Sequence, residues 1–519
     1  MEAEEIKKKQ KRVMIYVMII SLICVVGVSY AFFTAGMSSE TSTTVRADAG
    51  TMKITYDGGA NINLAGIYPK DDVWATKTIT ITGNNTTDAE MYYKLTLVVD
   101  SNTFKTDDPL QYELVSTNTS TNGEIIPNIS KTDITGTSIE LGSGHFLKAN
   151  NAKQTYELKI YYPKKATSQN ANQGAAFNAH VEITSAKAPT VSNLVETILA
   201  KNEVKTPITT PGAAVSTASE ALLASTEDDY GTSYYFRGAV TNNYVEFANK
   251  CWWIVRVGGD GSVKLILHND NKAGVANPCN SANNSTSAAF ARFSGETYKS
   301  KFNKNWNDNA YVGFKYGTAG ASDYATTHAN TNNSTILTNL ETWYTNNLKT
   351  YADAIADTVW CTDKTNVIDT SYNPWSYGGN ATGLGYSTNK TYYGATQRLA
   401  SASGSAGGTG PSLKCNGELS KINSKVGLIT ADELALAGYA YGLQNTTTYL
   451  QENATDAWWS LSPRDFDGGS AYVWLVGGSS GTFSYNDVRN ANGVRPSISL
   501  KPSTNVTGNG TSEEPYVVK

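Results

Sequence analysis

The sequence predicts a mainly β protein with some α-helix, in which an N-terminal hydrophobic segment precedes an all-β sandwich and then an α+β domain. Three observations support this fold class. The chain has 519 residues, which suits two or three domains better than one. Its first half contains short runs of alternating apolar and polar residues, which are typical of strands. Its second half combines apolar runs with a helical pattern and four of the five cysteines.

The composition favours an exported protein. Hydrophobic residues make up 40% of the chain and charged residues only 17%, while Tyr occurs 31 times. The polar surface must therefore come mostly from uncharged side chains, as in many extracellular β proteins and binding loops. The net charge of -4 argues against a nucleic-acid partner, which requires a basic patch.

Residues 13–33 form an apolar run without a charge, long enough to cross about 30 Å of hydrocarbon as a helix. Residues 1–12 are basic and are predicted to stay in the cytoplasm, so the chain after residue 33 lies outside the cell. The small residues Ser29 and Ala31 also suit a signal-peptidase site. The run is therefore either a retained single-pass membrane anchor or the leader of a secreted protein.

Residues 34–187 are predicted to form the β-sandwich. Residues 78–82 (TITIT) alternate strictly and end at a Gly-Asn-Asn turn. The same period of two recurs in residues 92–99, 155–162 and 177–183, and short strands between polar turns are typical of an antiparallel sandwich. Residues 188–225 are predicted to be a connector, with a helical stretch followed by a linker rich in Thr, Pro, Ala and Ser.

Residues 226–519 are predicted to form the α+β domain. Residues 251–257 and 262–267 are apolar runs on either side of a Gly/Asp turn and predict a hairpin. Residues 426–438 predict a strand that runs into a helix. Thr430 and Glu433 can form a capping box at its start, and Gly438 ends it.

The cysteines of this domain predict disulfide bonds. Cys251, Cys279, Cys361 and Cys415 are an even number in one exported domain, which predicts two bridges. Three pairings are possible, and the spacing does not choose between them. A zinc site is disfavoured because the spacing is wide and no CxxC motif or neighbouring His accompanies it.

The first domain resembles Firmicute surface proteins of the camelysin and biofilm-fibre type, through the leader ending VGVSYAFFTAG and through residues 170–177 (NANQGAAF). Camelysin carries a protease label. This domain has no HExxH motif, however, and its only histidines are His145 and His180, so we do not expect protease activity.

The second domain resembles a Firmicute surface domain family through four blocks in fixed order, CWWIVR, VGLITADELALAG, WWSLSP and GVRPSISL. That family is related to C-type-lectin-like and formylglycine-generating-enzyme-like proteins. The resemblance implies a C-type-lectin-like fold for residues 226–519. In such a fold two short helices flank a twisted sheet, and an irregular loop region carries the binding site.

No catalytic residue and no cofactor is predicted. Disulfide pairing accounts for all four cysteines, and a serine-hydrolase site needs a His beside a Ser and an acid. His268 and His328 lie instead in Asn-rich stretches that are typical of a solvated surface. Calcium remains an alternative, because Asp465, Asp467, Asn486 and Asp487 offer oxygen ligands, but the sugar-specific triplets of lectins are absent and no metal is predicted.

Residues 464–492 are the predicted ligand-binding stretch. An apolar or conformational frame that includes Trp458, Trp474 and Arg495 encloses polar and aromatic residues of the types found in adaptable recognition surfaces. Arg495 is expected to brace the fold. The position of the stretch resembles the variable region of retroelement-diversified surface proteins. The candidate ligand-binding residues are Arg464, Asp465, Asp467, Tyr472, Ser480, Thr482, Ser484, Tyr485, Asn486, Asp487, Arg489 and Asn490.

The sequence thus predicts a cell-surface receptor or adhesin that binds an external protein or glycan without covalent chemistry. The alternative is a structural surface or matrix subunit of the fibre type with no specific ligand. A regular edge strand in residues 34–187 that can accept a further strand favours the alternative. An aromatic and polar face near Tyr472 and Tyr485 favours binding.

Overall fold

The structure, a computed structural model, describes residues 43–48, 51–86, 90–118, 122–186, 191–270, 277–283, 289–293, 298–376 and 381–519. The predicted basic tail (1–12) and apolar segment (13–33) lie outside the described residues. Within the described part, no helix is both long enough and apolar enough to cross a membrane.

The chain divides into two compact units, residues 1–189 and residues 190–519, and each has its own buried hydrophobic cluster. The described part of the predicted connector belongs to the second unit. Helix α2 (Leu194–Lys201) is capped by the Asn193 side chain, which accepts hydrogen bonds from the first-turn amides. Its residues Leu194 and Ile198 are fully buried in the core of the second unit. The helix is therefore stabilised by packing of its apolar face against the core of the second unit. The local sequence does not show this contact.

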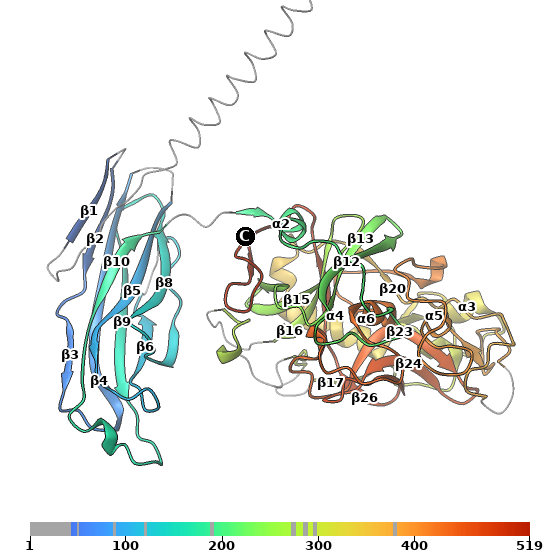
Figure 1. The fold of residues 1–519 in the computed structure, drawn as a ribbon. Helices are drawn as coiled ribbons and strands as arrows, with labels where there is room; N and C mark the ends of the chain where they lie inside the picture. The colour runs from blue at the N-terminus through green and yellow to red at the C-terminus, as the bar shows by residue number, and fades with distance from the viewer. Residues whose placement is uncertain are drawn as a thin grey trace, which may run out of the picture. The chain divides into compact units, whose positions relative to one another are not determined.

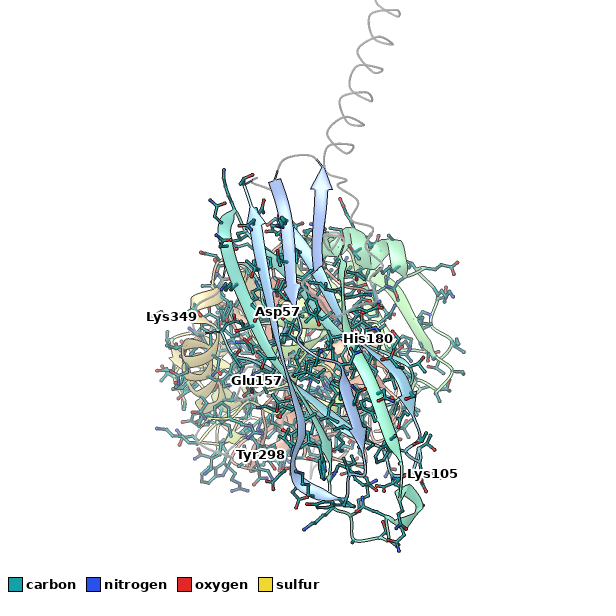
Figure 2. The ribbon with its side chains drawn as sticks, turned by 90° about the vertical axis from the view of Figure 1, so that its left-hand side faces the viewer. Asp57, Lys105, Glu157, His180, Tyr298 and Lys349 are labelled. Carbon is teal, nitrogen blue, oxygen red and sulfur yellow. A yellow bond between two sulfur atoms is a disulfide. The ribbon has the colours of Figure 1, made fainter. Side chains whose placement is uncertain are left out.

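The first unit consists of two antiparallel sheets (Figure 1). In one sheet the order is β1 (Thr43–Asp48), β2 (Thr51–Asp57), β4 (Lys70–Asn85), β9 (Ala149–Tyr162), β6 (Gln111–Ser116) and β7 (Ile129–Asp133). In the other it is β3 (Ile62–Ala65), β10 (Ala176–Ser185), β5 (Met91–Asn102) and β8 (Ser138–Phe146). Figure 2 looks onto these strands and labels Glu157 on β9 and His180 on β10.

Alternating burial explains why these segments form strands. In β5 the side chains of Tyr93, Leu95 and Leu97 are fully buried, whereas the residues between them are partly exposed. Both sheets contribute such residues to one cluster. The period of two in the sequence therefore predicted the strands correctly, and the two-sheet arrangement agrees with the predicted sandwich.

The second unit contains two larger sheets and five α-helices among its described residues (Figure 1). The larger sheet has the order β11 (Ser192–Asn193), β28 (Asn505–Thr507), β29 (Tyr516–Val518), β14 (Tyr244–Phe247), β15 (Lys250–Val257), β13 (Gly231–Gly238) and β12 (Ala221–Asp228). In the same sheet, β16 (Val263–Asn269) pairs with β15 and with β27 (Ser497–Leu500). The other large sheet has the order β17 (Lys299–Lys301), β26 (Ala491–Gly493), β23 (Trp458–Phe466), β24 (Ala471–Val476) and β25 (Phe483–Asp487), with β21 (Thr391–Tyr392) on β23.

The smaller elements complete the unit. Two short sheets pair β18 (Lys315–Tyr316) with β19 (Asn332–Asn333) and β20 (Thr358–Cys361) with β22 (Lys421–Ser424). The remaining helices are α3 (Tyr324–His328), α4 (Thr335–Asn347), α5 (Gly394–Leu399) and α6 (Ala431–Ala437). Both large sheets contribute side chains to one large buried cluster, and the described part of the unit has two smaller clusters, one around Leu222 and one around Tyr372.

The predicted hairpin and capped helix of this unit are confirmed. Strands β15 and β16 pair as the hairpin. Helix α6 begins with the capping box of Thr430 and Glu433 and ends at Gly438, whose φ of +126° suits a glycine.

A buried ion-pair network connects α6 to the larger sheet. The Glu433 carboxylate lies 2.7 Å from Lys264 Nζ on β16 and 2.9 Å from Arg256 Nε on β15. Arg256 also contacts Asp228 on β12 at 3.0 Å. Burial by itself raises the pKa of Glu433, but the two cations outweigh it and hold the pKa at about 2. The network therefore requires an ionised Glu433.

The two predicted disulfides are present, and the structure selects one of the three pairings. Cys251 on β15 pairs with Cys279, and Cys361 on β20 pairs with Cys415. The first bridge is buried, since Cys251 and Cys279 are at most 1% exposed. The second bridge is partly exposed to solvent.

Candidate ligand-binding surface

The predicted ligand-binding stretch forms a hairpin at the edge of the second large sheet. Strand β24 pairs with β23 on one side and with β25 on the other. The loop between β24 and β25 packs closely against another segment, because a Cβ on Gly481 would lie 2.1 Å from the backbone oxygen of Asn445. Gly481 also has a φ of +58°, so this turn requires glycine.

The register of the hairpin places aromatic residues together. Tyr472 lies opposite Asp487 and Trp474 lies opposite Tyr485, so these four side chains share one face of the sheet. The rings of Tyr472 and Tyr485 are 5.6 Å apart at an angle of 81°, in an edge-to-face contact. Trp474 is fully buried, whereas Tyr472 and Tyr485 are half-buried. The face therefore consists of a buried aromatic layer with two tyrosines at its surface.

Arg464 lies beneath this face, contrary to its predicted role as a ligand contact. Its side chain is fully buried, and its guanidinium carbon lies 3.5 Å from the ring centroid of Trp375 and 3.4 Å from that of Tyr485. The guanidinium therefore stacks between two rings, where cation–π attraction replaces hydration. We remove Arg464 from the candidate contacts.

Asp465 is also buried and is removed for the same reason. Its Oδ1 accepts a hydrogen bond of 2.6 Å from Arg464 Nη1. The pairing of β23 with β24 shifts register between Pro463 and Asp465, and this irregularity leaves Arg464 and Asp465 in contact with each other. Burial raises the pKa of Asp465 to about 6, although the neighbouring guanidinium acts in the opposite direction.

The acidic residues considered for calcium are engaged in other contacts. Asp487 is 5% exposed, and its Oδ2 lies 3.1 Å from Arg489 Nε. Asp465 is paired with Arg464, as described above. No group of three His, Cys, Asp or Glu in the described parts of the chain is arranged to hold a metal ion. Asp487 orients Arg489 instead.

The other candidates occupy different parts of the hairpin. Arg489 and Asn490 are exposed just after β25. Ser480 and Thr482 bond to each other at the turn, with their hydroxyl oxygens 2.9 Å apart. The remaining half-exposed candidates are Asp467, Tyr472, Ser484, Tyr485 and Asn486. Since side chains alternate along β25, Ser484 and Asn486 lie on the face opposite Tyr485, so the candidates do not form a single patch.

Trp306 is a surface aromatic residue that the sequence analysis missed. It is 37% exposed, and the guanidinium carbon of Arg489 lies 4.9 Å from its ring centroid. The backbone oxygen of Trp306 accepts a hydrogen bond of 2.8 Å from the amide of Ala471, which fixes it beside the start of β24. The only local signal was a single Trp within the polar run 303–309. Its position beside Arg489 depends on the fold.

The predicted frame residues are buried. Trp458, Trp474 and Arg495 are 0% exposed. Arg495 donates hydrogen bonds to the backbone oxygens of Leu267, on β16, and Leu450. It therefore connects segments far apart in the chain, as expected for a residue that braces the fold.

The histidines of the second unit, His268 and His328, are packed in its interior, so the expected surface position is wrong for both. His268 stacks on Trp253 with ring centroids 3.9 Å apart, and burial lowers its pKa to about 3. His328 Nε2 lies 2.7 Å from the backbone oxygen of Gly385, and burial likewise lowers its pKa to about 3. Both rings are thus neutral near pH 7 and enclosed by protein.

The candidate ligand-binding surface is therefore defined as Trp306, Tyr472, Tyr485, Arg489 and Asn490. The ring of Tyr485 covers the buried guanidinium of Arg464 and contacts Tyr472, while the exposed guanidinium of Arg489 contacts Asp487 and Trp306. No family model, no curated protein and no solved structure matches this chain.

Proposed function

We propose that this protein is a cell-surface receptor or adhesin, and that its second unit, of the C-type-lectin-like class, binds an external protein or glycan through the candidate ligand-binding surface. The observation that best supports the proposal is the edge-to-face contact of two half-exposed tyrosines, Tyr472 and Tyr485, of which Tyr485 covers the buried Arg464. In this proposal the apolar run 13–33 tethers the protein to the membrane, or is cleaved to release it.

The energetics support recognition by this surface. Tyrosines offer a large amphipathic area and have few rotatable bonds, so little conformational entropy is lost when they bind. Arg464 beneath Tyr485 restricts that ring further, and Asp487 restricts Arg489. A surface whose side chains are already ordered spends less of its contact energy on ordering them. Central aromatic anchors commonly contribute about 2 kcal/mol or more to an interface.

The variable-region hypothesis belongs to the same proposal. Arg489 and Asn490 are exposed, so a change of residue at these positions alters recognition with little effect on the core. Arg464, Asp465 and Asp487 are buried and paired, so their replacement disturbs the support of the surface. Diversification compatible with folding is therefore confined to the exposed and half-exposed positions.

The alternative role as a fibre subunit has less support from the first unit. At one sheet edge, β7 is only five residues long and exposes Lys131 and Asp133. Short charged edge strands discourage the addition of a further strand. At an edge of the second sheet, β8 pairs with β5 through a register irregularity near Leu95. The other two edge strands are β1, with six residues, and β3, with four, so β8, with nine, is the longest edge strand among the described residues of this unit.

Binding to a panel of glycans and extracellular proteins, measured with the full-length chain, tests the proposal. For any ligand found, Arg489→Ala and Trp306→Ala should each weaken binding about tenfold, which corresponds to 1.4 kcal/mol. Lys349→Ala, which removes another exposed cation of the same unit, is the matched control and should leave binding unchanged. The melting temperature should stay constant in all three variants. Binding that survives both surface substitutions places the ligand elsewhere and overturns the assignment.

A further inference from the structure

The second unit contains an open groove that shares no lining residue with the candidate ligand-binding surface. It is lined by three segments, residues 365–369, residues 394–398 and residues 409–416, and encloses about 510 Å³. Ligand sites in proteins usually measure roughly 300–1,000 Å³. A smaller charged cavity adjoins it and shares the lining residues Arg398 and Ser412.

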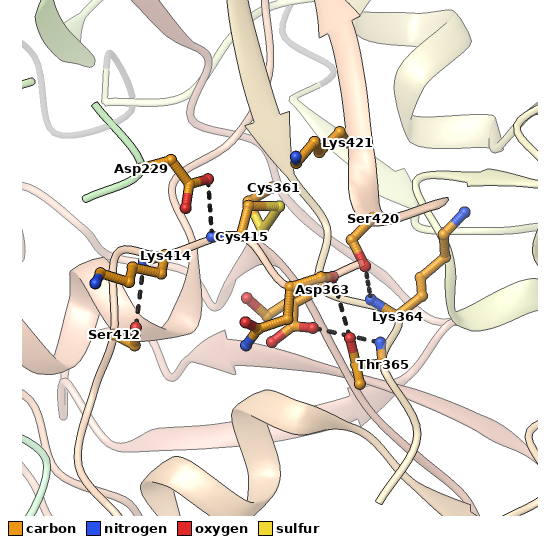
Figure 3. Close-up of a disulfide and its surroundings, with 12 residues drawn as sticks. Asp229, Cys361, Asp363, Lys364, Thr365, Ser412, Lys414, Cys415, Ser420 and Lys421 are labelled. Carbon is orange, nitrogen blue, oxygen red and sulfur yellow. Dashed lines mark hydrogen bonds between the residues drawn. A yellow bond between two sulfur atoms is a disulfide. The ribbon is translucent and has the colours of Figure 1, made fainter. Parts of the chain in front are cut away.

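The walls of this groove are fixed by covalent and charged contacts. The disulfide between Cys361 and Cys415 fixes the chain next to the lining residue Asn416, and the Cys415 amide donates to Asp229 (Figure 3). Arg398 donates from Nε and Nη2 to both oxygens of Asp432, at 2.6 and 2.8 Å. Asp432 also accepts from the Ser412 amide at 2.9 Å. A site with ordered walls loses little conformational entropy when a ligand enters.

Several polar side chains in the groove are not used by the fold. Among the described residues, the side chains of Gln397, Thr409 and Asn416 make no hydrogen bond, and all three are at least partly exposed. The carboxamides of Gln397 and Asn416 each donate and accept hydrogen bonds. By contrast, Thr365 donates its hydroxyl to the backbone oxygen of Asn416 at 3.1 Å and so supports the wall. The groove therefore presents two bifunctional amides and a hydroxyl.

The charges of the groove are neutralised locally. Arg398 is paired with Asp432 and, at 2.6 Å, with Asp363. Asp369 at the rim accepts from the amide and hydroxyl of Ser371. A strongly charged ligand finds no unpaired buried charge to bind. The groove instead suits an uncharged ligand that both donates and accepts hydrogen bonds, as the carboxamides of Gln397 and Asn416 do.

The rim of the groove carries an unusual aliphatic surface. Ile368 lines the groove and is 79% exposed. The backbone at Gly383 packs against it, since a Cβ added there would lie 3.0 Å from the Cα of Ile368. The next residue, Leu384, is 43% exposed. None of the lining residues is aromatic, so a sugar ring has no aromatic face to stack on. An aliphatic side chain of a ligand, however, can pack against Ile368 and remove apolar surface from water.

We propose that this groove, formed by residues 365–369, 394–398 and 409–416, binds a short, extended, uncharged peptide segment that carries an aliphatic side chain. The carboxamides of Gln397 and Asn416 pair with the N–H and C=O groups of the peptide backbone. Ile368 contacts the aliphatic side chain. The bound segment is part of a protein partner, and its site is separate from the candidate ligand-binding surface.

Selection from a phage-displayed library of random octapeptides, with the immobilised full-length chain as bait, tests this inference. Enriched sequences should contain Val, Leu or Ile and lack charge at neighbouring positions. An enriched peptide is then synthesised with acetyl and amide caps, and its affinity is measured by fluorescence polarisation. Gln397→Met and Asn416→Ala should each weaken binding about fivefold, the effect of one hydrogen bond of about 1 kcal/mol.

Gln444→Met, which removes another exposed carboxamide of the same unit, is the matched control and should bind the peptide as the natural chain does. Arg489→Ala should also bind normally, which separates this groove from the candidate ligand-binding surface. If no peptide is enriched, or if the two groove variants bind the enriched peptide normally, the inference is overturned. Displacement of the peptide by an N-acetylglucosamine tetramer overturns the assignment to a peptide and indicates a glycan site.

Discussion

The guanidinium carbon of Arg464 lies 3.4 Å from the centroid of the Tyr485 ring. A cation is thus buried directly beneath an aromatic residue of the candidate ligand-binding surface. The cation is neutralised by Asp465 and covered on its other side by Trp375. A substitution at Tyr485 or at Arg464 is therefore expected to change both the stability of the second unit and the candidate ligand-binding surface.

Replacement of Arg464 should destabilise the second unit strongly. Arg464→Leu leaves the carboxylate of Asp465 buried without its partner, and the loss of one member of a buried ion pair typically costs about 3–5 kcal/mol. Urea denaturation followed by tryptophan fluorescence measures the free energy of unfolding. Arg489→Leu is the control, because its side chain is exposed. Equal stability of the two variants would contradict the buried position of Arg464.

Two substitutions of Tyr485 should separate its two roles. Tyr485→Ala removes the ring that covers Arg464 and should lower the melting temperature as well as ligand affinity. Tyr485→Phe keeps the ring and removes only the hydroxyl, so it should leave the melting temperature unchanged and weaken only a ligand that bonds to that hydroxyl. A normal melting temperature for Tyr485→Ala would show that the stacking contributes nothing to folding.

Acid should weaken the contact between α6 and the larger sheet. The pKa of Glu433 is about 2 in the folded chain, below its ordinary value of 4.5. Its stabilising contribution is therefore complete above about pH 4.5 and is lost as the pH falls toward 2. Glu433→Gln should be destabilised by about 3 kcal/mol near pH 7 and should show a smaller loss of stability between pH 5 and pH 2. Parallel pH profiles of the variant and the natural chain would refute this assignment.

The two disulfides should differ in their rates of reduction. Cys361 and Cys415 are partly exposed, whereas Cys251 and Cys279 are at most 1% exposed, and a thiolate must reach the sulfur that it attacks. Brief treatment of the native chain with dithiothreitol, followed by iodoacetamide and peptide mass spectrometry, should label Cys361 and Cys415 first. Labelling of Cys251 before Cys361 would contradict the difference in exposure.

The first unit should fold without the second. Its buried cluster contains no residue from beyond residue 189, and its two sheets are complete within residues 43–186. A fragment of residues 34–187 should melt cooperatively and give a β-type circular dichroism spectrum. A fragment that fails to fold alone would show that residues of the second unit are needed.

The sequence by itself determined the features that depend on neighbouring residues. The alternation in residues 92–99 predicted β5 because side chains of a strand point to opposite faces. Thr430 and Glu433 predicted the start of α6 because a capping box spans only three residues. The even number of cysteines predicted two bridges, and both are present.

The tertiary structure alone decided the features that depend on contacts between distant segments. The choice of Cys361 with Cys415 required the fold, because spacing leaves three pairings open. Arg464 and Arg489 both lie among polar residues in the sequence, yet only Arg464 is buried. Its guanidinium lies between the rings of Tyr485 and Trp375, and Trp375 comes from a loop about ninety residues earlier. Trp306 lies far from Arg489 in sequence, and the fold brings the two together where the backbone oxygen of Trp306 accepts from the amide of Ala471 on β24. Local sequence patterns determine which helix or strand forms. Which side chains are buried, and which residues they contact, depends on the surfaces that the completed fold brings together.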